Sequence, residues 1–242
     1  MPRDFAFRGC YTVRMIEIRI APTCVPMSEY DIATCRNQII DFAPAIHIDI
    51  DDAVFAPLFT WPYIGPGSFA PFNLKGAEGL TVDVHLMVQN PELIGLEFVR
   101  AGASCVMGHV EVFESATEAQ SVLNAWRSAG ASEVGLGILF NTSFEDMDAF
   151  ISNCDIVHMM SIDKIGTQGI PYNPSAPKRI ADFHAQYPRV IISVDGGVSL
   201  NNIADLVRAG ARRFGVGSAI AKASDPKAAY RNLKATAESA LK

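Results

Sequence analysis

The sequence lacks several features that would place it in other classes of protein. No apolar run reaches the ~20 residues that a membrane-spanning helix needs, and the first 14 residues lack the apolar segment of a secretory signal. The five cysteines are widely spaced and form no Cys-x-x-Cys pair, which favours reduced thiols over a disulfide framework. The formal net charge of -6 offers no basic face for nucleic acid. We therefore expect a cytoplasmic protein with no membrane or nucleic-acid partner.

What is present fits one large α/β domain. The chain has 242 residues, of which 49% are hydrophobic and 19% charged, so it can bury a sizeable core. No linker or low-complexity segment marks a second domain. We interpret residues 1–14 as an N-terminal extension and residues 15–242 as one catalytic domain, since Met15 begins the first convincing strand.

Short β-branched runs alternate with longer amphipathic stretches along the chain. The expected strands are 15–21, 45–50, 82–88, 105–111, 133–140, 155–162, 190–194 and 213–216. The expected helices are 28–40, 91–101, 116–129, 144–151, 176–187, 200–209 and 226–241, with one short helix in the irregular loop 55–79. Strands that alternate with helices imply a parallel sheet. Eight units in a chain of this length favour a single closed (β/α)₈ TIM barrel. The alternative, an open doubly wound sheet, lacks a G-x-G-x-x-G after the first strand.

Polar residues occupy one face of the second expected strand. His47, Asp49 and Asp51 alternate with Ile48 and Ile50, so the three polar side chains point the same way, towards the barrel interior. Burying two carboxylates and an imidazole is costly without compensation, and a cation is the simplest compensator. Imidazole nitrogen combined with carboxylate oxygen suits zinc, iron, manganese or cobalt.

Two further strand ends carry residues of the same kind. Asp83, His85 and Met87 share one face of the third strand, and Asp195 ends the seventh, just before two glycines. Barrel enzymes keep their active sites at the C-terminal ends of the strands. These residues either form one metal centre or are structural polar groups.

Three more polar residues lie on the fourth and sixth strands. His109 and Glu111 share a face, and they either support the metal ligands or form an ordinary ion pair or solvated pair. We interpret His158, which precedes Met159 and Met160 in an apolar strand, as a core-packing residue.

A glycine-rich segment, Gly215-Val216-Gly217-Ser218, precedes a helical stretch near the end of the chain. Backbone N–H groups at such a junction bind phosphate well, and phosphate sites after the last two strands recur in barrels. Gly196, Gly197, Gly217 and Ser218 are therefore candidate phosphate-binding residues. The alternative is that both segments are simple tight turns.

Taken in order, these motifs resemble the ribulose-phosphate 3-epimerase family from about Met15 to the last helix. Ile20–Thr23 is similar to the family's I-A-P-S, with Thr23 in place of a substrate-contacting serine. Residues 47–57 resemble H-x-D-x-M-D-G-x-F-x-P, and residues 83–87 resemble D-x-H-L-M. Residues 194–198 and 217–220 are similar to V-D-G-G-V and G-S-A-I.

The resemblance implies a barrel of the ribulose-phosphate-binding type with one divalent metal ion (Zn, Fe, Mn or Co) held by His47, Asp49, His85 and Asp195. It implies that Asp49 and Asp195 are the acid/base pair that inverts C3 of a ketose phosphate through an enediolate. D-ribulose 5-phosphate, converted to D-xylulose 5-phosphate in the pentose phosphate pathway, is the first substrate to expect. The residues implied for substrate or phosphate binding are Thr23, His85, Gly166, Thr167, Gly196, Gly197, Gly217 and Ser218, with Asp51, Met87 and Met160 as additional candidates. We also expect a homo-oligomer, because outer barrel helices often pack between subunits.

The sequence departs from the family pattern at three places. The family's methionine is Asp51 here, the glycine that follows is Ala53, and the loop P-G-F-G-G-Q is replaced by residues 164–169, which begin with Lys164. These departures leave open an epimerase of another ketose phosphate, such as allulose 6-phosphate, or a non-catalytic sugar-phosphate-binding paralogue. A decarboxylase of the orotidine-phosphate type would need D-x-K-x-x-D, which the second and third strands lack.

Overall fold

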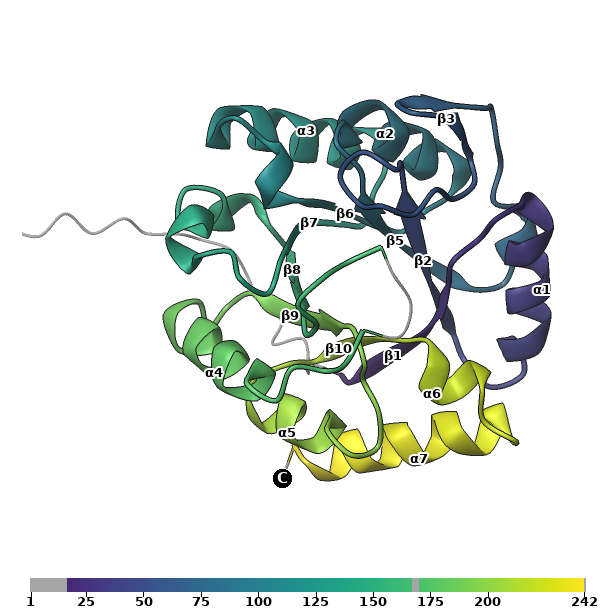
Figure 1. Cartoon of the computed structure of the whole chain (residues 1–242), viewed down its shortest axis with the longest axis vertical. Helices are drawn as coiled ribbons and strands as arrows, with labels where there is room; N and C mark the ends of the chain where they lie inside the picture. The colour runs from purple at the N-terminus through teal and green to yellow at the C-terminus, as the bar shows by residue number, and fades with distance from the viewer. Residues whose placement is uncertain (1–16, 167–169, 242) are drawn as a thin grey trace, which may run out of the picture.

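The computed structural model describes residues 17–166 and 170–241, which form a closed parallel barrel ringed by helices (Figure 1). The strands lie in the order β1-β10-β9-β8-β7-β6-β5-β2, and β2 pairs with β1 to close the ring. The eight strands are β1 Arg19–Cys24, β2 Ala45–Asp51, β5 Thr81–Met87, β6 Cys105–His109, β7 Glu133–Ile138, β8 Ile156–Met160, β9 Ile191–Asp195 and β10 Arg213–Val216. The predicted (β/α)₈ barrel is thus confirmed. The predicted extension, residues 1–14, lies outside the described residues.

Local sequence signals explain where the outer helices begin and end. The helices are α1 Glu29–Ile39, α2 Pro91–Ala101, α3 Ala116–Ala129, α4 Ala176–Gln186, α5 Ile203–Arg208, α6 Ser218–Ala221 and α7 Pro226–Ser239. Pro91 occupies the first turn of α2, and Gly102 ends that helix with φ +111°, a conformation that favours glycine. The Ser115 side chain accepts a hydrogen bond from the Glu118 N–H and caps α3. Among the described residues, no helix is long and apolar enough to cross a membrane.

The predicted helix 144–151 is wrong. The segment forms two short 3₁₀ helices, η3 Phe144–Met147 and η4 Ile151–Asn153. Phe144, Asp148 and Phe150 are weak helix formers, and one turn is enough to bury Met147 completely. The connection therefore covers the barrel without a regular helix.

The irregular segment after β2 folds over the upper end of the barrel. It holds the hairpin β3 Tyr63–Gly65 and β4 Ser68–Phe69, and the predicted short helix is the 3₁₀ turn η1 Lys75–Ala77. Asp52 fixes its start: one carboxylate oxygen accepts from the Val54 and Phe55 N–H groups, and the other accepts from the Gln89 N–H. These bonds hold the loop next to the C-terminal ends of β2 and β5.

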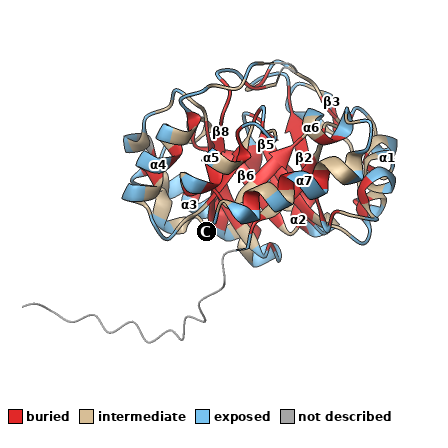
Figure 2. Ribbon diagram, turned by 90° about the horizontal axis from the view of Figure 1, so that it is seen from below, coloured by how far each residue is buried: buried red, intermediate tan, exposed pale blue. Residues whose placement is uncertain are grey.

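The apolar core lies between the barrel wall and the helices. Ile48 and Ile50 of β2 are fully buried there, as are Val84 and Leu86 of β5. Figure 2 shows the buried strands at the centre and helices whose outer faces are exposed. The alternate residues of the same strands face inwards, so the polar side chains enter the barrel.

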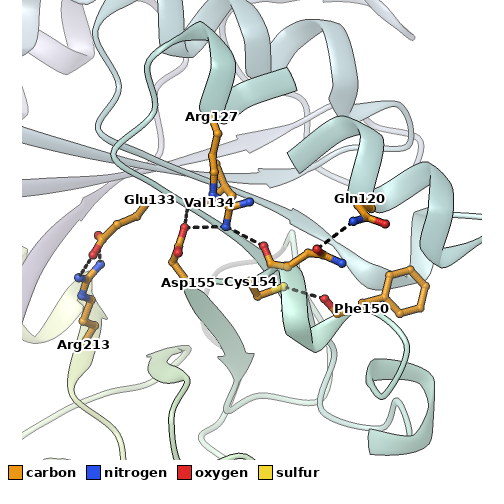
Figure 3. A network of polar contacts seen from close by, with 9 residues as sticks. Gln120, Arg127, Glu133, Val134, Phe150, Cys154, Asp155 and Arg213 are labelled. Atoms are coloured by element: carbon orange, nitrogen blue, oxygen red, sulfur yellow. Dashed lines mark hydrogen bonds and ion pairs between the residues drawn. The ribbon is translucent and has the colours of Figure 1, made fainter. Parts of the chain in front are cut away.

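Ion pairs close the N-terminal end of the barrel. Arg213 makes two hydrogen bonds of 2.5 and 2.6 Å to Glu133, and Arg19 lies 2.7 Å from Asp83. Figure 3 shows the Arg213–Glu133 pair beside a second contact, in which Arg127 donates to Asp155 at 2.9 Å. Residues at this end of a barrel serve stability, whereas chemistry occupies the opposite end.

Candidate metal centre and active site

The four predicted metal ligands all lie inside the barrel near its C-terminal end. His47 and Asp49 come from β2, His85 from β5 and Asp195 from the last position of β9. Asp49 pairs with His85 in the strand register, so these two side chains are direct neighbours. One Asp49 carboxylate oxygen, Oδ1, lies 3.1 Å from His47 Nε2 and 3.0 Å from His85 Nδ1. His47, Asp49 and His85 are all buried.

The possible ligand atoms form two overlapping groups that share His85. Atoms from Asp49, His85 and Asp195 lie within 4.8 Å of one another, and so do atoms from His47, His85 and His158. The structure therefore brings the predicted residues together but groups His47 with His158 rather than with Asp195. Imidazole and carboxylate donors in one buried cluster fit a divalent zinc, iron, manganese or cobalt ion.

A hydrogen-bonded chain extends from this cluster to β6. His85 Nε2 lies 2.8 Å from His109 Nε2, and His109 Nδ1 lies 2.9 Å from Glu111. Glu111 also accepts hydrogen bonds from the Leu139 N–H and the Thr142 hydroxyl. Burial opposes ionisation, yet His109 and Thr142 lower the pKa of Glu111 below its ordinary value. The sequence left two interpretations of His109 and Glu111 open. The contacts agree with the first, in which this pair supports the candidate metal ligand His85.

The number of hydrogens available for this series of hydrogen bonds explains why a cation fits. The Glu111–His109, His109–His85 and His85–Asp49 contacts each need one hydrogen, but two neutral imidazoles supply only two. If Glu111 accepts from His109, then His109 accepts from His85, and His85 Nδ1 faces Asp49 with a lone pair. Two acceptors at 3.0 Å need a positive charge beside them. A metal ion bound by both atoms would supply it.

The neighbouring charges separate the pKa values of the two aspartates. Burial would raise the pKa of Asp49, but the charge and hydrogen bond of His47 hold it well below its ordinary value. Burial and the negative charge of Asp49 raise the pKa of Asp195 to about 7. Burial would lower the pKa of His47, but Asp49 and Asp195 raise it to about 9. Two carboxyl groups with separated pKa values are suited to act as an acid/base pair.

His158 differs from its predicted role in the apolar core. It is fully buried, but it lies inside the barrel among other imidazoles, with ring centroids 5.1 Å from His47 and 4.4 Å from His85. Its Nδ1 atom lies 2.8 Å from the Ser193 hydroxyl, and within the described ranges its Nε2 atom has no hydrogen-bond partner. The alternation of residues along β8 could have indicated this position, because His158 lies on the same strand face as Met160, which lines the site.

A small cavity of about 100 Å³ lies above the cluster. It is lined by Asp49, Asp51, Asp195 and the mostly apolar set Val25, Leu58, Met87, Met160, Ile162, Ile165 and Gly166. The additional candidates Asp51, Met87 and Met160 thus lie together at the site. Both carboxylate oxygens of Asp51 are buried and have no hydrogen-bond partner among the residues that the structure describes. Burial and the charge of Asp49 raise the pKa of Asp51 to about 8.

The residues predicted to bind phosphate are spread around the barrel mouth. Gly166 lines the cavity above the cluster, whereas Thr23 and Gly217 line a separate cavity of about 260 Å³ bounded by the ends of β1 and β10 and by α1 and α6. Gly196, Gly197 and Ser218 line neither of these cavities. Gly196 and Gly197 have φ values of +102° and +68°, so the turn after β9 requires glycine. Thr167 lies outside the described residues.

Comparison with known proteins agrees with these features. A model of the "Ribulose-phosphate 3 epimerase family" matches residues 20–221, which is most of the chain. The chain belongs to the ribulose-phosphate 3-epimerase family. The resemblance expected from the sequence motifs is therefore confirmed, and with it the prediction of an enzyme of the carbohydrate isomerase class.

Named relatives of this epimerase family cover most of the chain. A ribulose-phosphate 3-epimerase of Aquifex aeolicus (strain VF5) is 30% identical over 82% of this chain and 87% of its own length. A chloroplastic ribulose-5-phosphate-3-epimerase of Arabidopsis thaliana is 32% identical over 79% of this chain and 66% of its own length. Among solved structures, 3-keto-L-gulonate-6-phosphate decarboxylase from Vibrio cholerae O1 biovar El Tor superposes with a TM-score of 0.67. It is 10% identical and covers 93% of this chain and 99% of its own, so it supports the barrel fold alone.

Proposed function

We propose that this chain is a metal-dependent epimerase that inverts C3 of a ketose phosphate, with D-ribulose 5-phosphate and D-xylulose 5-phosphate as its pair of substrates. The observation that carries the proposal is the group formed by Asp49, His85 and Asp195. Asp49 comes from β2 and Asp195 from β9, two strands that β1 and β10 separate in the ring. The two carboxylates therefore approach the site from different sides, as inversion at a planar carbon requires.

In this proposal His47, Asp49, His85 and Asp195 hold the metal ion. The bound ion would polarise the C2 carbonyl and so make the neighbouring C3 hydrogen more acidic. One of the two aspartates takes the proton from C3, and the other gives a proton to the opposite face of the planar carbon.

The cavity walls support binding and protection of the sugar. Met87 and Met160 line the space beside the two aspartates, and these apolar side chains would exclude water from the reacting carbon. We assign substrate and phosphate contacts to Thr23, His85, Gly166, Thr167, Gly196, Gly197, Gly217 and Ser218. The buried Thr23 hydroxyl, which has no hydrogen-bond partner in the described part of the chain, supports a ligand contact there.

Asp51 favours a second candidate, an epimerase of a different ketose phosphate such as allulose 6-phosphate. Its two oxygens are buried beside Asp49 and accept no hydrogen bond from residues 17–166 or 170–241. Leaving such acceptors unpaired costs about 1–3 kcal/mol or more. A substrate hydroxyl that donates to Asp51 would remove this cost. A longer or differently configured sugar would present a different hydroxyl there.

Exchange of the C3 hydrogen with deuterated solvent tests both candidates. Metal-loaded protein is incubated in D₂O with a panel of pentulose and hexulose phosphates, and loss of the C3–H signal is followed by NMR. Exchange on ribulose 5-phosphate supports the first candidate, and exchange on hexulose phosphates alone supports the second. No exchange on any member would contradict both and leave a non-catalytic sugar-phosphate-binding protein. The cytoplasmic location and homo-oligomeric state stay predictions.

A further inference from the structure

The metal centre holds a third imidazole that the proposed set of four ligands does not include. His158 joins His47 and His85 in a group whose nitrogen atoms lie within 4.8 Å of one another. Zn–N bonds of about 2.0–2.1 Å bring the ligand nitrogens of one zinc ion somewhat closer together than this. Small rotations of the rings would therefore let all three contact one ion.

The hydrogen bonds of His158 are those of a ligand imidazole. A metal-bound histidine usually uses its other ring nitrogen in a hydrogen bond that fixes the ring orientation. His158 Nδ1 is held by the Ser193 hydroxyl at 2.8 Å, directly across the β8–β9 register. The remaining nitrogen, Nε2, belongs to a residue with 0% exposure and has no hydrogen-bond partner among the described residues. An unpaired buried nitrogen costs about 1–3 kcal/mol, which coordination would offset.

The barrel wall leaves room for this cluster of imidazoles. Gly137 of β7 lies between His109 of β6 and His158 of β8 in the strand register. A Cβ atom at Gly137 would lie 3.0 Å from His109 Nε2. The missing side chain lets His109 and His158 lie close to His85, whose ring centroid is 5.0 Å from His109 and 4.4 Å from His158.

We propose that His158 Nε2 is an additional ligand of the metal ion, so that the centre binds it with the three imidazoles of His47, His85 and His158. This inference rests on the metal dependence in the proposed function. Imidazole suits zinc and other later first-row metals, whereas manganese and magnesium prefer oxygen ligands. The third imidazole therefore selects Zn²⁺ or Co²⁺ over Mn²⁺, and a centre without it would lose that preference.

The test counts imidazoles directly. Protein loaded with one equivalent of Zn²⁺ is studied by X-ray absorption, in which imidazole ligands give a characteristic multiple-scattering pattern. We expect three imidazoles per zinc in the natural chain and two in His158→Leu. Competition with a chromophoric chelator should show zinc affinity at least ~10-fold lower in His158→Leu, with Mn²⁺ affinity changed less. Met159→Leu is the matched control, because Met159 is a buried neighbour on the opposite strand face.

Two results would overturn the assignment: two imidazoles per zinc in the natural chain, or unchanged zinc affinity in His158→Leu. The natural chain alone decides the count if His158→Leu does not fold. Failure here is distinct from failure of the proposed function. A natural chain that exchanges C3 hydrogen with two imidazoles per zinc loses only the His158 assignment, whereas a natural chain that binds no metal loses both.

Discussion

The Nε2 atoms of His85 and His109 lie 2.8 Å apart, so these two imidazoles share one hydrogen inside the barrel. Glu111 decides which ring donates it. Because the Glu111 carboxylate accepts from His109 Nδ1, His109 Nε2 must accept from His85. His85 Nδ1 is then free of hydrogen and can bind a cation beside Asp49.

Glu111→Gln should therefore weaken metal binding without contacting the ion. A glutamine amide can donate to His109 Nδ1. His109 Nε2 would then donate to His85 Nε2, which reverses the direction of that hydrogen bond. We expect metal affinity to fall by about 10–100-fold, as for other residues that orient a ligand. Competition with a chromophoric chelator measures it. Glu92→Gln, on the exposed start of α2, is the control and should leave affinity unchanged. Equal affinities in all three chains would contradict the proposed orientation of His85.

Removal of the metal should abolish activity. Exhaustive chelation removes the ion, and adding Zn²⁺, Mn²⁺, Fe²⁺ or Co²⁺ should restore C3 exchange. Because the ion binds the folded chain, the thermal midpoint should rise with metal concentration, by an amount set by RT ln(1 + [L]/Kd). Calorimetry on the chelated and reloaded protein measures this. Full activity after chelation, with metal content verified by mass spectrometry, would exclude a metal-dependent reaction.

Asp195→Asn should stop the chemistry and leave the fold intact. The amide cannot exchange a proton with C3, and loss of one acid/base group typically costs about 10²–10⁴-fold in rate. We expect C3 exchange to fall by about 10³-fold, with little change in the circular dichroism spectrum. Asp205→Asn, on the exposed side of α5, is the matched control. A mutant that retains most of its exchange activity would remove Asp195 from the reaction.

Asp51→Asn should change the pH dependence of stability in the metal-free protein. The pKa of Asp51 is raised to about 8 by burial, so the folded chain holds a proton there that the unfolded chain releases above its ordinary value of 3.8. The native carboxylate therefore lowers stability progressively from about pH 4 to pH 8. The substituted amide carries no charge, so the stability of the mutant relative to that of the natural chain should increase across this window. The increase should be on the order of a few kcal/mol at about pH 8.

Urea unfolding at about pH 4.5, 6 and 8, which spans this window, measures the gain. A constant offset between the two chains would reflect the amide itself, so the slope with pH is the decisive quantity. Asp41→Asn, an exposed substitution, should give the same stability profile as the natural chain. A stability difference between Asp51→Asn and the natural chain that does not grow with pH would show that Asp51 ionises normally.

Glu133→Ala should reduce stability and spare the chemistry. It removes the partner of Arg213 at the N-terminal end of the barrel, where both side chains are 13% exposed. Breaking a largely buried pair costs about 3–5 kcal/mol, and urea unfolding would measure the loss. Glu97→Ala, in the exposed pair with Arg100, should cost less than about 1 kcal/mol. An equal loss in both mutants would show that burial adds nothing to the Arg213 pair. C3 exchange and metal affinity should stay within about 2-fold, since such sites serve stability.

The sequence by itself determined the barrel and most of its boundaries. Strand alternation is a local property, so the inward direction of His47, Asp49 and Asp51 followed from a period of two. The limits of α2 followed from Pro91 and Gly102, which act within one helical turn. The family motifs on separate strands added the chemistry that these positions imply.

Only the tertiary structure decided how the polar residues are paired. Asp83 and His85 share a strand face, yet Asp83 pairs with Arg19 at one end of the barrel and His85 joins Asp49 towards the other. The grouping of His158 with His47 and His85, and the direction of the hydrogen bond from His85 to His109, depend on side chains from four different strands. Burial and hydrogen-bond partners arise when the barrel closes, because closure brings together atoms that no local pattern relates.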